Sequence, residues 1–531
     1  MQHSRTPARR RRSRALAFGV AAALTIGVIP ATAANGGFRT SVPSMLDPIA
    51  PGVQIQPIMT VGDRLASGFV LDSLLDGISL KTRGNGRVDL WVNHETSLVP
   101  FPGVISDFNN SQVSRIALNQ HSMGVLKADY AIASDANYQR FCSNFLAGAE
   151  HGFDREILFT NEEATDIVNR TGIAWPATPA NGSNAEQAGV VVALDIKSGE
   201  YRTIYGMGRH NHENSVAIPG YDELVILSGD DTFSAPSSQL YSYIADDTDA
   251  VWNDEGALWA FVSDDPDTND YGDLSMGETI SGRFIEVPRD IATGLSNPTT
   301  AQTVLEHWSN ANNVFQFIRV EDIAYDRNDP NIVYFADTGE PRAVADAATG
   351  RLARGSSATR GLYPNGRIFK MVLNEDEPRT VDGLSILIDG DAGGYNNRGV
   401  IHQPDNIETT RNGILIQEDP GSHNQAADGP QGSTARIWHY AFATGALREI
   451  AKVNQSLDQN PAYDVDPATT APAAAGAWES SGIVDASAAF GPDWFLVDVQ
   501  AGSLTLERVE GAGVIFEREG GQLLAIKIPG A

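Results

Sequence analysis

The sequence is poor in cysteine, because only Cys142 occurs among 531 residues. A single cysteine cannot form an internal disulfide, so the size of the fold and bound metals have to supply its stability. Long apolar runs are also missing after residue 33, which predicts no integral membrane segment. P-loops, dinucleotide fingerprints and G-x-S-x-G nucleophile elbows are absent as well. The sequence therefore gives no sign of a P-loop nucleotide hydrolase, a Rossmann dehydrogenase or an α/β-hydrolase.

Positive charge is scarce too. There are 38 lysines and arginines against 67 aspartates and glutamates, which gives a formal net charge of −29. The first 33 residues hold six arginines and no acid, so their removal takes the charge from −29 to −35. Such a surface repels nucleic acid and anionic lipid and attracts divalent cations. Acidity that only keeps an exported protein soluble is an equally good interpretation of the surface as a whole.

The amino terminus has the three regions of a secretory signal peptide. An arginine-rich segment precedes the apolar stretch from Ala15 to Ile29, and small residues follow at Ala31, Thr32 and Ala33. We therefore predict a signal peptide over residues 1–33. The mature protein is expected to be a soluble monomer that is secreted or held outside the cell envelope. The paired arginines leave the Sec and twin-arginine routes both open.

One short pattern occurs six times in the sequence. Each copy is a Gly/Asp/Pro turn, then a β-branched or aromatic run that ends in acids or amides. Successive copies end 68, 68, 108, 80 and 81 residues apart, at Glu95, Glu163, Asp231, Gly339, Asp419 and Gln500. A repeat of that size, with several strands in each unit, predicts an all-β fold over residues 34–531. The specific expectation is a six-bladed β-propeller with loop and short-helix insertions.

Helices are expected to be few and short, near Asn109 to Leu126 and Asp135 to Gly148. Two turns between apolar runs predict hairpins, at 198–200 and 444–446, because each has glycine at its centre. The terminal strands are expected to close the ring.

A second acidic series precedes the repeated strands by one hairpin's length, and it contains Glu213, Glu321, Asp405 and Glu479. In a propeller these strands would be the innermost, so the acids should face the central channel. Calcium and iron(III) favour carboxylate oxygens, and a ring of carboxylates is poorly tolerated without cations. Beside them, His212 is the histidine that we expect to bind or orient a metal ligand. The acids at the ends of the repeated strands give four further candidate ligands: Glu95, Glu162, Glu163 and Glu418.

Five motifs carry a family resemblance. They are N-H-E at 93–95, G-R-x-x-H-E at 208–213, G-D-D at 229–231, R-x-E-D at 319–322 and P-D-N at 404–406. In this order they resemble the PhoX-type alkaline phosphatases over most of the mature chain. The resemblance implies a secreted six-bladed propeller that hydrolyses phosphate monoesters at a calcium and iron cluster. Motif by motif, it implies Arg319 as the phosphate clamp and four acids as metal ligands: Glu213, Asp230, Glu321 and Asp405.

The sequence departs from the family at a T-C-E-E segment, where a cysteine thiolate binds iron. Here the segment reads Thr160-Asn161-Glu162-Glu163, and a neutral amide cannot replace a thiolate. Cys142 lies 19 residues earlier, and two interpretations of it are open: it reaches the metal site, or it is a buried structural cysteine, which we favour. The family's Q-H-P is also altered, to Gln500-Ala501-Gly502. We therefore predict bound calcium, with iron either scarce or held differently.

Three functions remain open on these residues. The leading one is a metal-dependent phosphatase that acts on small phosphate monoesters. A calcium-dependent lactonase or esterase could use the same architecture with one axial calcium and a nearby base. The third is a secreted calcium-stabilised propeller that binds a partner and catalyses nothing, because one fold hosts many functions.

Overall fold

The computed structural model describes residues 36–100, 104–170, 185–232, 238–345, 351–356, 359–394, 399–420, 433–465, 476–511 and 513–531. The expected signal peptide, residues 1–33, lies outside these ranges. The described chain is mostly β, as the sequence predicts. Its helices are short: α1 (Thr248–Trp252), α2 (Arg289–Thr293), α3 (Ala301–Ala311) and α4 (Ser487–Phe490), with the 3₁₀ turns η1 (Ser134–Ala136), η2 (Ala149–His151), η3 (Tyr205–Met207) and η4 (Asp391–Gly393).

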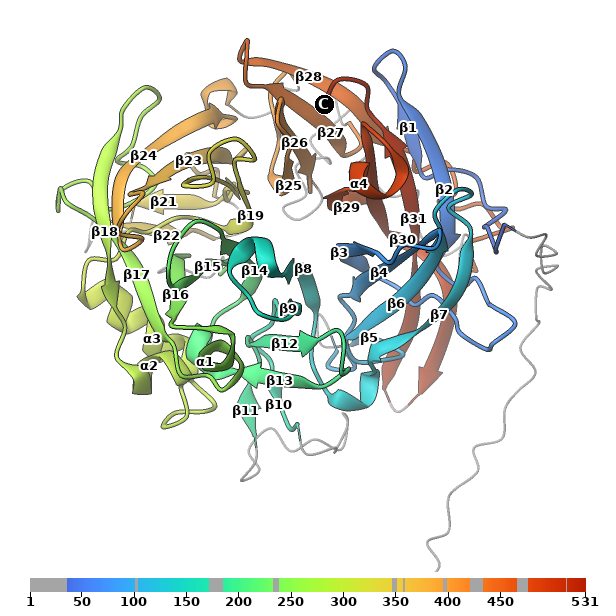
Figure 1. The fold of residues 1–531 in the computed structure, drawn as a ribbon, viewed down its shortest axis with the longest axis horizontal. Coiled ribbons are helices and arrows are strands. Elements are labelled where there is room, and N and C mark those ends of the chain that lie inside the picture. Colours follow the sequence, from blue (N-terminus) through green and yellow to red (C-terminus); the bar gives the residue numbers. More distant parts are fainter. Residues whose placement is uncertain are drawn as a thin grey trace, which may run out of the picture.

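The strands form antiparallel runs arranged around a common centre (Figure 1). The first two runs are β3 (Leu75–Thr82), β4 (Arg87–His94), β6 (Gln112–Asn119), β7 (Val125–Ile132), and then β8 (Phe141–Ala147), β9 (Ile157–Glu162), β12 (Val191–Asp195), β13 (Tyr201–Ile204). The next two are β14 (His212–Ile218), β15 (Leu224–Asp230), β16 (Leu240–Ala245), β17 (Ala257–Ser263), and then β19 (Val320–Tyr325), β20 (Ile332–Asp337), β23 (Arg367–Leu373), β24 (Thr380–Asp389). Strand β18 (Ile280–Glu286) pairs with both β17 and β24 and joins these two runs into one nine-stranded sheet.

The last two runs complete the circuit. One contains β25 (Pro404–Thr409), β26 (Gly413–Glu418), β27 (Arg436–Ala441), β28 (Ala446–Val453) and the edge strand β1 (Leu46–Pro48). The other contains β29 (Glu479–Asp485), β30 (Trp494–Gly511), β31 (Val514–Lys527) and β2 (Gln54–Thr60). The short strands are β5 (Ile105–Asp107), which pairs with β31, and the pairs β10 (Ile167–Val168) with β11 (Glu186–Gln187) and β21 (Ala343–Ala345) with β22 (Leu352–Arg354).

The first strands of the six runs contact one another in a closed order, β3–β8–β14–β19–β25–β29 and back to β3. They lie nearest the centre of Figure 1. Closure depends on the amino-terminal strand β2, which pairs with the carboxy-terminal strand β31 from Gln54 opposite Lys527 to Thr60 opposite Gln522. The expected closure by terminal strands is therefore confirmed, and segments at opposite ends of the chain hold the ring together.

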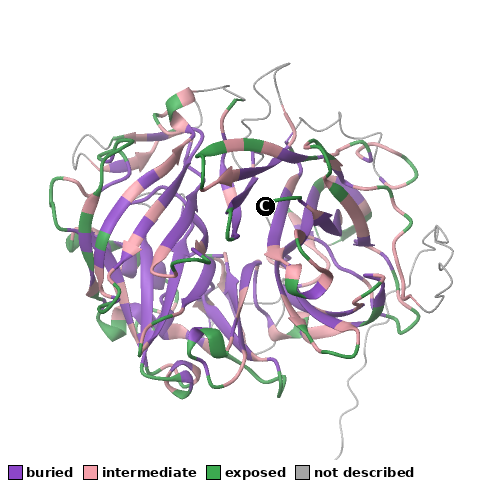
Figure 2. Ribbon diagram, turned by 45° about the horizontal axis from the view of Figure 1, so that its top comes forward, coloured by how far each residue is buried: buried purple, intermediate pink, exposed green. Residues whose placement is uncertain are grey.

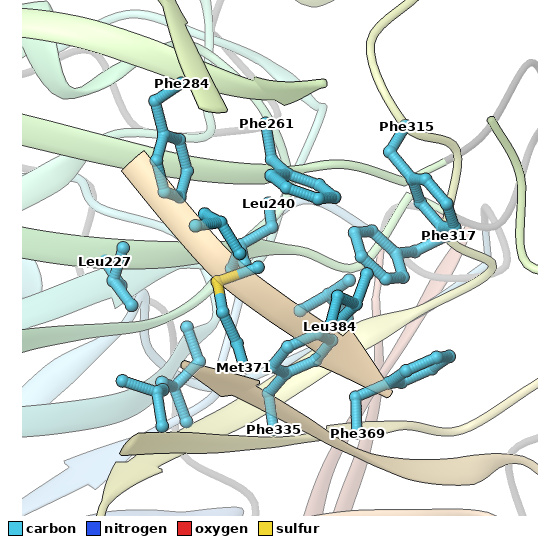
Figure 3. Packing of buried hydrophobic residues seen from close by; sticks show 14 of the residues in the cluster. Leu227, Leu240, Phe261, Phe284, Phe315, Phe317, Phe335, Phe369, Met371 and Leu384 are labelled. Carbon is cyan, nitrogen blue, oxygen red and sulfur yellow. The ribbon is translucent and has the colours of Figure 1, made fainter. Parts of the chain in front are cut away.

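Apolar side chains fill the space between neighbouring runs. In the cluster of Figure 3, Phe335 on β20 stacks on Phe369 on β23 with 5.2 Å between ring centroids, and Phe317 meets Phe335 edge-on at the same separation. Each fully buried side chain of this size contributes about 1.5–3 kcal/mol. Figure 2 shows how burial is distributed over the whole ring: most buried residues lie along the strands, and most exposed residues lie in the connections. This packing fixes the inner strands rigidly around the axis.

Both predicted helices near 109–126 and 135–148 are wrong, because these segments contain β6, the start of β7, and β8. Val113, Ile116 and Leu118 in the first segment pair with β4 and β7. Tertiary pairing has overridden a weak local pattern. The predicted hairpins at 198–200 and 444–446 are confirmed, since they join β12 to β13 and β27 to β28.

Candidate metal centre

Five of the inner strands have an irregularity at the same place. In β3, β8, β14, β19 and β25, pairing with the following strand is interrupted for two residues directly after the first residue of the strand. A β-bulge of this kind bends the strand and re-aims a side chain. The first interrupted residues are Asp76, Cys142, Glu213, Glu321 and Asp405. A repeated bulge thus presents one candidate metal ligand from each of five strands.

These five side chains belong to four overlapping groups that could hold metal ions. Within each group, one ligand atom from every member lies within 4.8 Å of the others. The groups are Asp76–Glu95–Cys142, Cys142–Glu163–Glu213, Glu213–Glu321–Asp405 and Asp405–Asp419–Glu479. Because neighbouring groups share a residue, they form one continuous cluster across the ring. The structure thus brings together five of the predicted ligands, Glu95, Glu163, Glu213, Glu321 and Asp405.

Three predicted ligands lie outside these groups: Glu162, Asp230 and Glu418. Each is the last residue of its strand, and the following residue, Glu163, Asp231 or Asp419, lies in the cluster or beside it. Successive side chains on a strand point to opposite faces. The repeated acidic ends were therefore recognised, but the residue facing the centre is the second of each pair.

The outward acids have other partners. Glu162 accepts two hydrogen bonds from Arg170, at 2.9 and 2.7 Å, and Glu418 accepts two from Arg436, at 2.8 and 2.9 Å. Asp230 accepts a hydrogen bond from Thr232 N at 3.1 Å and lies 3.8 Å from the His210 ring. The two arginine pairs hold neighbouring segments in place, so Glu162 and Glu418 serve the structure of the wall and not its centre.

Hydrogen bonds orient several of the candidate ligands, and Asp76 and Glu213 each keep one carboxylate oxygen without a hydrogen bond. Ser143 donates to Glu213 Oε1 at 2.7 Å, and Gln500 donates to both Asp76 Oδ2 and Glu95 Oε2, at 3.0 and 3.1 Å. The other oxygens, Asp76 Oδ1 and Glu213 Oε2, are buried without a hydrogen-bond partner. A buried carboxylate oxygen without a partner is costly, and a bound cation would satisfy it. The donor set therefore fits hard cations, with one thiol among the oxygens.

Burial dominates the electrostatics of the cluster. It raises the pKa of Asp76 to about 6 and that of Glu95 to about 8, and the negative charge of Asp76 adds to the shift of Glu95. Burial also raises the pKa of Glu163, Glu213 and Asp405 well above the ordinary value, with neighbouring carboxylates as the next cause. Cations at the centre would act in the opposite direction and keep these carboxyl groups charged.

Arg319 lies beside the cluster in a fixed orientation. Its Nε and Nη2 donate to the two oxygens of Asp231, each at 2.6 Å, and Nη2 also lies 2.8 Å from Glu321 Oε1. Glu321 in turn accepts from Thr338 at 2.6 Å. Val320, which separates Arg319 from Glu321 in the sequence, is buried in the hydrophobic core. The guanidinium is therefore adjacent to a candidate ligand, and its plane is set by Asp231.

Cys142 lies among the candidate metal ligands, whereas Asn161, at the position of the family's cysteine, is held by hydrogen bonds to the protein. Cys142 belongs to two of the four groups, and its Sγ lies 3.3 Å from Asp76 Oδ2. The Asn161 amide donates to Ser143 O at 3.0 Å and accepts from Ser215 at 2.8 Å. The interpretation of Cys142 as a purely structural residue is thus at odds with its position. His212 is satisfied by Ser228 and the Gly208 carbonyl and does not enter a group.

A cavity of about 490 Å³ opens onto the cluster. Its lining includes Glu95, Glu163 and Glu479 from the groups, together with Arg140 and Gln500. A second cavity, of about 370 Å³, lies at the other end of the inner strands and is lined by Asn214, Asp322 and Asn406 among others. A small molecule can therefore reach the cluster from the side of the first cavity.

Comparison with known proteins adds a family to this geometry. The structure of Pseudomonas fluorescens PhoX in complex with vanadate, a transition state analogue, matches with a TM-score of 0.58 at 16% identity, covering 93% of this chain and 98% of that one. A protein of unknown function from Dyadobacter fermentans matches with a TM-score of 0.39 at 10% identity, covering 90% and 100% of the two chains. No curated protein matches the sequence.

Among the described residues, no helix is both long and apolar enough to cross a membrane.

The sequence profile described as Alkaline phosphatase PhoX matches residues 147–470, which is more than half of the chain. The matched range contains Arg319 and three of the bulge residues, Glu213, Glu321 and Asp405. The chain therefore belongs to the alkaline phosphatase PhoX family.

Proposed function

We propose that this protein is a metal-dependent phosphatase that hydrolyses phosphate monoesters at the acidic cluster. The observation that carries the proposal is the continuous set of groups from Asp76 to Glu479, with buried oxygens that lack partners and a fixed guanidinium beside them. Family membership supports the same activity.

Each residue has a part that follows from its contacts. Arg319 faces the phosphate oxygens as a fixed positive charge, because its guanidinium lies beside the cluster and Asp231 has already fixed its plane. Glu321 links this clamp to the cluster, since its carboxylate lies against Arg319 and belongs to the central group. Ser143 and Gln500 hold Glu213, Asp76 and Glu95 in place, so no side chain has to reorganise during the reaction.

Bound cations would neutralise the charge of the ester and polarise its phosphorus–oxygen bonds. The carboxylates suit calcium, and Cys142 offers the soft donor that the sequence placed in doubt at Asn161. We propose that Asp76, Glu95, Glu163, Glu213, Glu321, Asp405, Asp419 and Glu479 hold calcium, and that Cys142 with its neighbours holds iron(III).

The finer expectations about the fold and location belong to the same proposal. We infer a six-bladed propeller, because six inner strands contact in a closed order and each begins an antiparallel run. The amino-terminal pattern of residues 1–33 supports export, and the acidic composition is suited to a calcium-rich exterior. We propose that the exported protein acts as a monomer on small phosphoesters.

Kinetics with purified protein test the activity. We expect hydrolysis of 4-nitrophenyl phosphate by protein supplied with calcium and iron, and its loss after exhaustive chelation. 4-Nitrophenyl acetate and a lactone are the matched substrates for the esterase alternative. Hydrolysis of the acetate or lactone without hydrolysis of the phosphate would contradict the proposal.

A further inference from the structure

Arg140 has an unusual backbone conformation, and it lies between two strands that end in candidate metal ligands. Its φ is +43°, in the left-handed region that residues other than glycine and asparagine seldom adopt. The Arg140 N–H donates to Thr96 O at 3.1 Å, and its carbonyl accepts from Glu163 N at 2.9 Å. These bonds hold Arg140 between the ends of β4 and β9, the two strands that deliver Glu95 and Glu163. Strain persists at such a position where the surrounding structure enforces it, often at a functional site.

The Arg140 side chain lines the cavity that opens onto the cluster. It forms an ion pair with Asp166, which also lines the cavity, and its positive charge acts on both Glu95 and Asp107. Arg140 is thus held at the cavity wall beside Asp166, and its charge acts toward the cluster.

The charges of the cavity wall make Arg140 distinctive. Among the described lining residues, every other charged side chain is acidic: Glu95, Asp107, Glu163, Asp166, Glu479 and Glu519. Arg319 is buried and does not line the cavity. A phosphate monoester carries negative charge, so it meets repulsion along this wall except at the cations and at Arg140.

We propose that Arg140 is a second phosphate-binding residue, which contacts phosphate oxygens of the entering ester and of the departing inorganic phosphate at the cavity side of the cluster. This inference rests on the proposed phosphatase function. It assigns Arg319 to the buried side of the phosphoryl group and Arg140 to the solvent side. Arg140 should therefore affect binding of substrate and product more than turnover.

The test uses the full, metal-loaded protein and inorganic phosphate as the probe. Arg140→Asn removes the charge while keeping a residue that tolerates the left-handed backbone. Arg140→Lys keeps the charge but not the fork. Arg327→Asn is the matched control, because Arg327 forms an ion pair with Glu408 at 2.6 Å and lines the second cavity instead.

For Arg140→Asn we expect the Kd for phosphate from titration calorimetry to rise about tenfold, with a similar rise in KM for 4-nitrophenyl phosphate and kcat within about twofold of the parent. Arg140→Lys should recover much of the loss, and Arg327→Asn should bind phosphate like the parent. An unchanged phosphate Kd in Arg140→Asn, or an equal loss in Arg327→Asn, would overturn the inference.

Asp166→Asn provides an independent variant should Arg140→Asn fail to fold. It removes the partner and leaves the guanidinium, so phosphate should bind at least as tightly as in the parent, and tenfold weaker binding would overturn the inference. A parent protein that binds phosphate but hydrolyses no monoester would refute the proposed function while leaving Arg140 as an anion-binding residue. A parent that binds no phosphate would refute both.

Discussion

Two adjacent glutamates offer a sharp contrast, because Glu162 and Glu163 have the same chemistry and opposite environments. Glu162 is fully buried and accepts two hydrogen bonds from Arg170, and its oxygens also accept from Gln139 N and Gly189 N. Glu162→Gln would leave Arg170 without this carboxylate. Removing one partner of a buried ion pair costs about 3–5 kcal/mol, and the remaining pair of Arg170 with Glu186 favours the lower end of that range.

Glu163→Gln should act in the reverse manner. Glu163 belongs to a candidate metal group, and burial and neighbouring carboxylates raise its pKa, so its neutral replacement costs the metal-free protein less than about 1 kcal/mol. It should instead lower metal content and activity. The measurements are urea unfolding of the metal-free proteins and metal analysis by mass spectrometry of the loaded ones. The reasoning fails if Glu163→Gln is the variant that unfolds easily, or if Glu162→Gln is the one that loses metal.

Three further predictions concern the centre itself. Exhaustive chelation should abolish activity and lower the melting temperature, since buried carboxylates repel once cations leave, and restored calcium should reverse the melting shift; an unchanged melt would contradict this. Arg319→Lys should reduce phosphomonoester turnover at least tenfold while metal content stays normal, whereas Glu321→Gln should lower metal occupancy as well; parental turnover in Arg319→Lys would remove it as the clamp. Cys142→Ser should lower bound iron far more than bound calcium, and Asn161→Cys should add little iron, because the Asn161 side chain is already engaged by Ser143 and Ser215; equal iron in Cys142→Ser and the parent would show that oxygen ligands suffice.

The sequence predicted the ring and the acidic series because both are written as local patterns. Repeated strand ends such as Glu95 and Glu163 can be recognised from turn residues and alternation, and their meeting in space follows from the repeat. The inner-strand acids Glu213, Glu321 and Asp405 were found the same way. They lie where the pattern places them, one from each of three successive inner strands.

What the sequence could not predict depends on register. To choose correctly between Glu418 and Asp419, or between Asp230 and Asp231, one has to know where the strand ends. A shift of one residue decides which face of the sheet a side chain occupies. The ligand position of Asp76 and Cys142 depends on bulges, which leave no reliable mark in a single sequence. Asp231 and Asp419 end two copies of the repeated pattern, but the pattern does not show that each strand stops one residue earlier. The outward acids Glu162 and Glu418 reveal their role only through their contacts with Arg170 and Arg436, which the pattern of acids does not predict.

The central claim is that the carboxylates and the thiol converging from the inner strands hold cations. Anomalous diffraction from crystals of protein loaded with calcium and iron tests it most directly. We expect peaks among Glu213, Glu321 and Asp405 and beside Cys142, with iron scattering strongest near the sulfur. Fully loaded crystals whose anomalous peaks lie only on the outer surface, with none among these side chains, would contradict the account.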